Sequence, residues 1–164
     1  MPAAVASAAC ILSPGMYNTY MNDNPRGEQA GLFTLLHAAG VAGSHVESKL
    51  AAVGLSLAKL AALTALRKAG ESLPLSQLAD RLSCVKSNIT QLVDRLEADG
   101  LVSRAADPHD RRSRLAVMTA AGREACDTGT RVQQEAERLL LSELSGPERQ
   151  QLAALMAKLE RSAK

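Results

Sequence analysis

Five polar side chains in the middle of the chain have the types and spacing needed to contact DNA bases. Lys86, Ser87, Asn88, Thr90 and Gln91 follow a turn segment, and an apolar stripe of helical period runs between them. Asparagine and glutamine can make paired hydrogen bonds to adenine, and lysine can contact guanine or phosphate. On the first turns of a helix these groups can enter the major groove, although a solvated face of an ordinary helix has the same composition.

A charged segment further along the chain carries two adjacent arginines, Arg111 and Arg112. A guanidinium at the tip of a hairpin can enter the narrow, electronegative minor groove. Asp107 and Asp110 are expected to brace these arginines by bidentate pairing before DNA binds. Between the two sets of polar residues, Arg95 is placed for a phosphate or guanine contact. The alternative for the tip is an exposed loop of salt bridges, which adds little stability.

Hydrophobic periodicity predicts the elements that position these residues. Short helices are expected at 75–82 and 86–96, joined by a tight turn at 83–85, and strands are expected at 101–104 and 114–119 on either side of the charged tip. A helix, a turn, a second helix and a basic hairpin make a winged helix. The predicted fold class is therefore mainly α with a small β-hairpin wing, in which a winged helix-turn-helix is flanked by dimerisation helices.

Longer helices are predicted on both sides of the winged unit. Ser56 and Thr119 are candidate N-caps, Gly129 is expected to weaken the helix that starts at 120, and Ser145 forms a capping box with Glu148. The terminal helices carry apolar stripes that the small central unit cannot cover, so we expect a second copy to bury them. The expected organisation is an extension at 1–26, an N-terminal dimerisation helix at 27–53, the DNA-binding domain at 54–119 and C-terminal dimerisation helices at 120–164.

The composition narrows the class of protein. With 46% hydrophobic and 22% charged residues among 164, the chain is expected to be globular. Segment 54–119 has ten Lys and Arg residues against seven Asp and Glu, a small excess of the sign that DNA attracts. No apolar run approaches the roughly 20 residues of a membrane span, and the apolar start has no basic region, so we expect neither membrane insertion nor secretion.

The cysteines and the absence of catalytic motifs point away from metal sites and enzymes. Cys10, Cys84 and Cys126 lie far apart and form no CxxC pair, so we expect a reduced, cytoplasmic protein without disulfides or zinc. Cys84 and Cys126 are predicted to pack in the interior. The sequence has no phosphate-binding loop, nucleophile elbow or HExxH motif, so neither a cofactor nor an enzymatic activity is expected.

The segment from about residue 55 to residue 124 resembles the MarR family of winged-helix transcription regulators. The matching residues are Leu78, Ala79, the runs 87–97, 99–102 and 107–112, and Leu115, Val117, Met118, Thr119 and Gly122. The resemblance implies an obligate homodimer that binds a pseudopalindromic operator, usually as a repressor. It also implies release by a small phenolic or anionic effector, or by thiol oxidation.

By position, the resemblance assigns base contacts to the polar residues of 86–91 and a wing contact to Arg111 or Arg112. One residue departs from the family pattern. The position before Lys86 often holds a polar or acidic cap in such proteins, and here it holds Val85. We therefore expect either that Ser83 caps the second helix or that this helix begins less sharply.

The resemblance also places the effector site between the dimerisation helices and the winged unit. Phe33, His37 and His45 lie on the helix that would form one wall, although a histidine on a helix is often a packed or solvated residue. Two alternative functions stay open. Cys10 could be an oxidant-sensing thiol, despite the lack of a basic residue within ten positions, and the winged helix could dock a protein in place of DNA.

Overall fold

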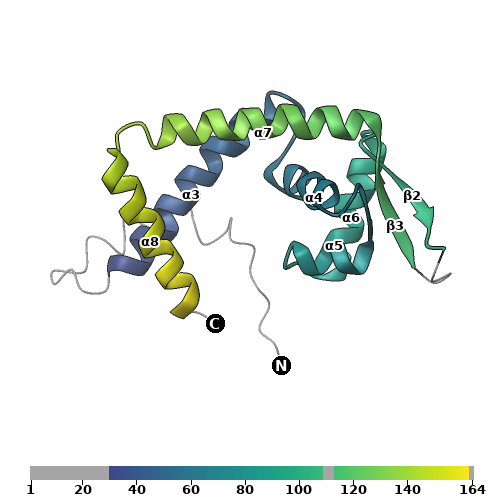
Figure 1. Ribbon diagram of the computed structural model, residues 1–164, viewed down its shortest axis with the longest axis horizontal. Coiled ribbons are helices and arrows are strands. Elements are labelled where there is room, and N and C mark those ends of the chain that lie inside the picture. Colours follow the sequence, from purple (N-terminus) through teal and green to yellow (C-terminus); the bar gives the residue numbers. More distant parts are fainter. Residues whose placement is uncertain (1–29, 109–112, 163–164) are drawn as a thin grey trace. The chain divides into compact units, whose positions relative to one another are not determined.

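The computed structural model describes residues 30–108 and 113–162 of the chain (Figure 1). The chain divides into two compact units, Met1–Glu47 and Ser48–Lys164. The second unit holds all the elements on which the predicted DNA contacts lie. Among the described residues, no helix is both long enough and apolar enough to cross a bilayer.

The predicted helices are present, with small shifts at their ends. They are α3 (Ala30–Ala51), α4 (Leu57–Lys68), α5 (Leu75–Arg81), α6 (Lys86–Ala98), α7 (Ala120–Leu140) and α8 (Gly146–Ser162). Helix α5 ends one residue before the predicted boundary, and α6 continues two residues beyond its own. Helix α7 runs unbroken through its two glycines.

Side-chain caps fix where three of these helices begin. The Oγ of Ser56 accepts a hydrogen bond from the backbone N–H three residues on, at 3.1 Å. The Oγ1 of Thr119 does the same for Gly122 at 3.0 Å, so both predicted caps are confirmed. At the start of α8, the carboxylate of Glu148 accepts hydrogen bonds from the backbone N–H and the hydroxyl of Ser145, at 2.7 and 2.6 Å. That is the half of the predicted capping box in which the acid contacts the cap residue.

A three-stranded antiparallel sheet completes the second unit. Its strands are β1 (Ser72–Pro74), β2 (Val102–Ala106) and β3 (Arg114–Met118), in the order β1-β3-β2. Figure 1 shows β2 and β3 side by side as the predicted wing hairpin, and β2 contacts α6. Strand β1 was not predicted, because three residues ending in Pro74 carry no alternation of apolar and polar side chains. The proline is tolerated because β1 lies at the edge of the sheet.

Leucine side chains of α4 form the centre of the core. Helix α4 contacts α5, α6 and α7 as well as β1 and β3. The buried side chains include Leu60, Leu63 and Leu66 of α4, Leu78 of α5, and Ile89, Val93 and Leu96 of α6. Because its apolar stripe is buried in this way, α6 is held with its polar face outward.

Gly129 of α7 is a packing requirement, and α7 runs unbroken through it, while the expected local weakness stays a prediction. A Cβ at this position would lie 2.6 Å from Cδ1 of Leu55 and 2.8 Å from Cδ1 of Leu60. Glycine lowers helix propensity by about 1 kcal/mol relative to alanine. Close contact between α7 and the start of α4 therefore outweighs the local preference.

Candidate nucleic-acid interface

The turn between α5 and α6 is built by backbone hydrogen bonds at the end of α5. The N–H of Cys84 donates to the carbonyl of Ala79 at 3.1 Å, and that of Ser83 donates to Asp80 at 3.2 Å. This pair of bonds is a Schellman C-cap. Ser83 takes the position that glycine usually occupies, with a φ of 50°, at a cost on the order of 1 kcal/mol. Ser83 therefore ends α5, and the expectation that it caps α6 was wrong.

Helix α6 begins without a side-chain cap among the described residues. Val85 is its N-cap residue, with extended backbone angles of −71° and 151°. The Val85 carbonyl accepts hydrogen bonds from the N–H groups of Asn88 and Ile89 at 3.0 and 3.2 Å. Its side chain is 64% exposed. An exposed apolar side chain thus occupies the N-cap position of α6.

The polar residues predicted to contact DNA occupy the outer face of α6. Successive residues of an α-helix are rotated by about 100°, which separates them from the buried stripe of Ile89, Val93 and Leu96. The exposed members are Ser87, Asn88, Thr90, Gln91 and Arg95. Lys86 starts the helix, but its side chain lies outside the described part. The arrangement presents amide and hydroxyl groups to an external surface, as base contacts require.

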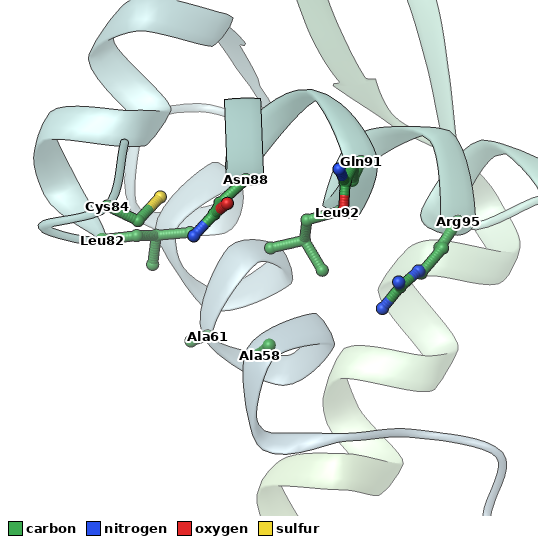
Figure 2. A pocket seen from close by; sticks show the side chains of 8 residues that line it. All are labelled: Ala58, Ala61, Leu82, Cys84, Asn88, Gln91, Leu92 and Arg95. Atoms are coloured by element: carbon green, nitrogen blue, oxygen red, sulfur yellow. The ribbon is translucent and has the colours of Figure 1, made fainter. Parts of the chain in front are cut away.

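A groove of about 480 Å³ runs along one side of this face, between α6 and α4 (Figure 2). Its lining consists of Ala58, Ala61, Leu82, Cys84, Asn88, Gln91, Leu92 and Arg95. In Figure 2, Leu82 and Cys84 lie at one end, Arg95 lies at the other, and the amides of Asn88 and Gln91 project between them. Cys84 is half-buried here, so its predicted place in the core was wrong: it follows the residue that turns the chain out of α5.

The other side of α6 is tied to the wing by Arg104 of β2. Its Nη2 lies 2.5 Å from the Oδ1 of Asp94, and its Nη1 lies 2.7 Å from the Oε2 of Glu97. Nη2 also donates to the carbonyl of Thr90 at 3.4 Å. The hydrogen bond to Asp94, with the negative charge of both acids, raises the pKa of Arg104 above its ordinary value. Arg104 was not predicted as a site residue; it neutralises the acidic side of α6 and fixes the hairpin against it.

The tip of the wing lies largely outside the described residues. This applies to Asp110, Arg111 and Arg112, whose predicted contacts stay predictions. At the base of the tip, the backbone N–H of Asp107 lies 3.4 Å from the carbonyl oxygen of Ser113 and closes the hairpin. The tip therefore starts from a β-ladder that is anchored to α6.

Two ion pairs connect the winged unit to α7. Arg67 at the end of α4 donates to the carboxylate of Asp127 at 2.7 Å and to the carbonyl of Arg123 at 2.9 Å. Arg123 in turn donates to Glu71 at 2.6 Å. The hydrogen bond to Asp127 raises the pKa of Arg67. These surface contacts join residues 67–71 to α7 and fix the direction in which α7 leaves the sheet.

The residues predicted to form an effector site belong to the first unit. Phe33 is 40% exposed, and His37 and His45 are half-buried on α3. Nε2 of His45 is buried and has no hydrogen-bond partner among the described residues. Cys10 lies outside the described residues. Cys126 is buried in α7, as predicted.

Comparisons with known proteins agree on one family. The MarR family model matches residues 55–113. The chain is 36% identical over 84 residues to the uncharacterised HTH-type transcriptional regulator YkoM of Bacillus subtilis, covering 51% of this chain and 54% of that protein. It is 31% identical to a probable transcriptional regulator from Pseudomonas aeruginosa whose crystal structure is known. That likeness has a TM-score of 0.72 and covers 80% of this chain and 97% of the other.

A third similarity concerns the fold alone. A mutant of Escherichia coli MarR, crystallised with operator DNA, is 24% identical, with a TM-score of 0.74 over 84% of this chain and 99% of that one. The chain spans about half the length of most of the curated relatives that it matches.

Proposed function

Because this chain belongs to the MarR family of transcriptional regulators, we propose that it binds a pseudopalindromic DNA operator as a homodimer, acts as a repressor and is released by a small molecule. The observation that carries the proposal is the polar outer face of α6. The opposite face of α6 is a buried apolar stripe, and ion pairs with Arg104 of β2 connect the helix to the wing. Arg104 joins the two DNA-facing elements into one surface. A recognition helix beside a wing is the arrangement in which winged helices enter a major groove and the adjacent minor groove.

Each contact residue has a role that follows from its chemistry. Asn88 and Gln91 have the amides suited to adenine, and Ser87 and Thr90 can bond to several bases. Lys86 and Arg95, at opposite ends of the outer face, suit phosphates. On the wing, Arg111 and Arg112 would enter the minor groove, braced by Asp107 and Asp110.

Salt-dependent DNA binding tests this assignment. A duplex selected from a random pool should bind the purified protein with an affinity that falls steeply as salt rises, because bound cations release counterions from phosphates. Replacing Arg111 and Arg112 by alanine should lower both the affinity and the salt slope. Asn88→Ala or Gln91→Ala should cost about 1–3 kcal/mol at particular base pairs and leave the slope unchanged. Failure to select any duplex would overturn the proposal.

The homodimer is proposed because α8 has no buried residue among those described. Leu152, Leu155 and Leu159 share one face of α8 and are 36%, 51% and 50% exposed. A second copy that packs against 120–164 and against the helix at 27–53 would remove these side chains from water.

Sedimentation equilibrium can test the dimer directly. The protein should be a dimer at micromolar concentration, and Leu155→Glu with Leu159→Glu should give monomers. Gln150→Glu, on the opposite face of α8, is the matched control and should leave the dimer intact. A monomeric wild-type protein would contradict the proposal.

For the effector, we propose a phenolic or anionic aromatic compound held by Phe33, His37 and His45. The support is the imidazole nitrogen of His45, which is buried and without a partner among the described residues, and which a hydroxyl or carboxylate could satisfy. Aromatic acids should raise the melting temperature and weaken DNA binding. Both effects should be lost in His45→Ala. A compound that releases DNA equally well from this variant would show that the site lies elsewhere.

A further inference from the structure

The side chain at the start of α6 is one that the fold itself does not explain. Val85 is the N-cap residue, where Ser, Thr, Asp or Asn would bond to a free N–H of the first turn. Its isopropyl group cannot make such a bond, and none is made from this side chain. At 64% exposure, it also gains little from burial. It is the most exposed of the large apolar side chains described.

Its position is next to the residues that would contact bases. In the N-terminal turn of a helix, the N-cap side chain neighbours that of the third helical residue, which here is Asn88. The Val85 carbonyl is bonded to the N–H of Asn88 at 3.0 Å, so the two side chains leave adjacent points of the same turn. Asn88 also lines the groove shown in Figure 2, at one end of which Cys84 lies. This turn is the part of a recognition helix that goes deepest into the major groove.

Apolar side chains have one specific partner in the major groove, which is the 5-methyl group of thymine. We propose that Val85 contacts the 5-methyl group of a thymine in each half-site of the operator. The thymine belongs to the base pair that Asn88 contacts through adenine, or to its neighbour. Val85 is then a specificity-determining residue, and this inference rests on the proposed function.

Deoxyuridine provides the test, because it differs from thymine by the methyl group alone. Each symmetric pair of thymines in the selected duplex is replaced in turn by deoxyuridine, and the affinity of the full-length protein is measured. One pair should weaken binding about fourfold per half-site, or about fifteenfold in total, from the loss of one buried methyl group at each. Val85→Ala should bind the unmodified duplex with a similar loss, and deoxyuridine at that pair should then have no further effect.

Two further variants separate base contact from a role in folding. Val85→Ser should raise the melting temperature, because serine caps the helix, and should still lose the thymine preference. Val53→Ala removes another exposed valine, outside α5 and α6, and should keep the full response to deoxyuridine. The inference is overturned if no thymine pair responds, or if the response is the same with Val85→Ala. If no duplex can be selected, the proposed function fails first.

Discussion

The ion pairs of Arg104 with Asp94 and Glu97 clamp the wing to α6. Replacing Arg104 by methionine, which is similar in length but uncharged, measures what this clamp contributes to stability and to DNA binding. The guanidinium makes two charged contacts, with Asp94 at 2.5 Å and Glu97 at 2.7 Å. Side-chain exposures of 27% for Arg104, 53% for Asp94 and 40% for Glu97 leave these contacts open to water. Each pair is then worth about 0.2–1 kcal/mol, so Arg104→Met should lower the free energy of unfolding by about 1 kcal/mol and the melting temperature by about 2–4 °C.

DNA binding should suffer more than stability, because two uncompensated carboxylates would face the phosphates in each half-site. A carboxylate about 10 Å from a phosphate in water is repelled by about 0.4 kcal/mol. Four such carboxylates in a dimer amount to about 1.6 kcal/mol, or roughly a fifteenfold loss of affinity at low salt. The loss should shrink as salt rises, because the Debye length falls to about 8 Å at 0.15 M.

A double-mutant cycle decides whether Arg104 acts through these two acids. The same Arg104→Met change is made in a protein that carries Asp94→Asn and Glu97→Gln, and unfolding and DNA binding are measured in both backgrounds. Coupling of about 0.5–2 kcal/mol is expected for groups in contact. Equal effects of Arg104→Met in the two backgrounds would refute the clamp.

Other changes test the framework that holds this surface. Gly122→Ala should destabilise the protein by about 3 kcal/mol or more, because the added Cβ would lie 2.1 Å from the carbonyl oxygen of Leu101. Gly146→Ala is the control: its Cβ would have nothing within 4 Å, so thermal unfolding should change little. Glu148→Gln should lower stability at neutral pH, since hydrogen bonds from the hydroxyl and N–H of Ser145 hold the pKa of Glu148 below its ordinary value in the folded protein. A lowered folded pKa stabilises the protein above the unfolded value, so the difference from wild type should disappear as pH falls through the folded pKa. A stability difference between the two proteins that does not change with pH would contradict this linkage. Arg67→Gln should weaken the contact between α7 and α4 and so increase the rate of amide hydrogen exchange near Asp127. An unchanged exchange rate there would contradict this prediction.

The sequence predicted those features whose causes are close together along the chain. Ser56 and Thr119 cap their helices through hydrogen bonds to residues three positions on. The polar face of α6 followed from helical period, and the hairpin followed from two apolar strands around a charged tip. Local chemistry of this kind is visible without knowing which elements pack together.

The features that the sequence did not predict depend on contacts made in the folded state. Arg104 lies seven and ten residues from the two acids it joins, on a different element, and nothing in its own strand marks it as special. Gly129 has low helix propensity, yet Leu55 and Leu60 leave no room for a Cβ. Ser83 ends α5 in a left-handed conformation that glycine usually adopts. For Arg104 and Gly129 the cause is contact between different elements, and for Ser83 it is the pair of backbone hydrogen bonds that ends α5.

Hydroxyl-radical footprinting of the selected duplex tests the central claim most directly. Two copies of α6 at a fixed separation should protect two stretches of backbone on one face of the DNA. Their centres should lie about one helical turn apart, or roughly 34 Å, and Leu155→Glu with Leu159→Glu should abolish the paired pattern. A single protected stretch, or a separation unrelated to the helical turn, would contradict a dimer that positions two recognition helices on one operator.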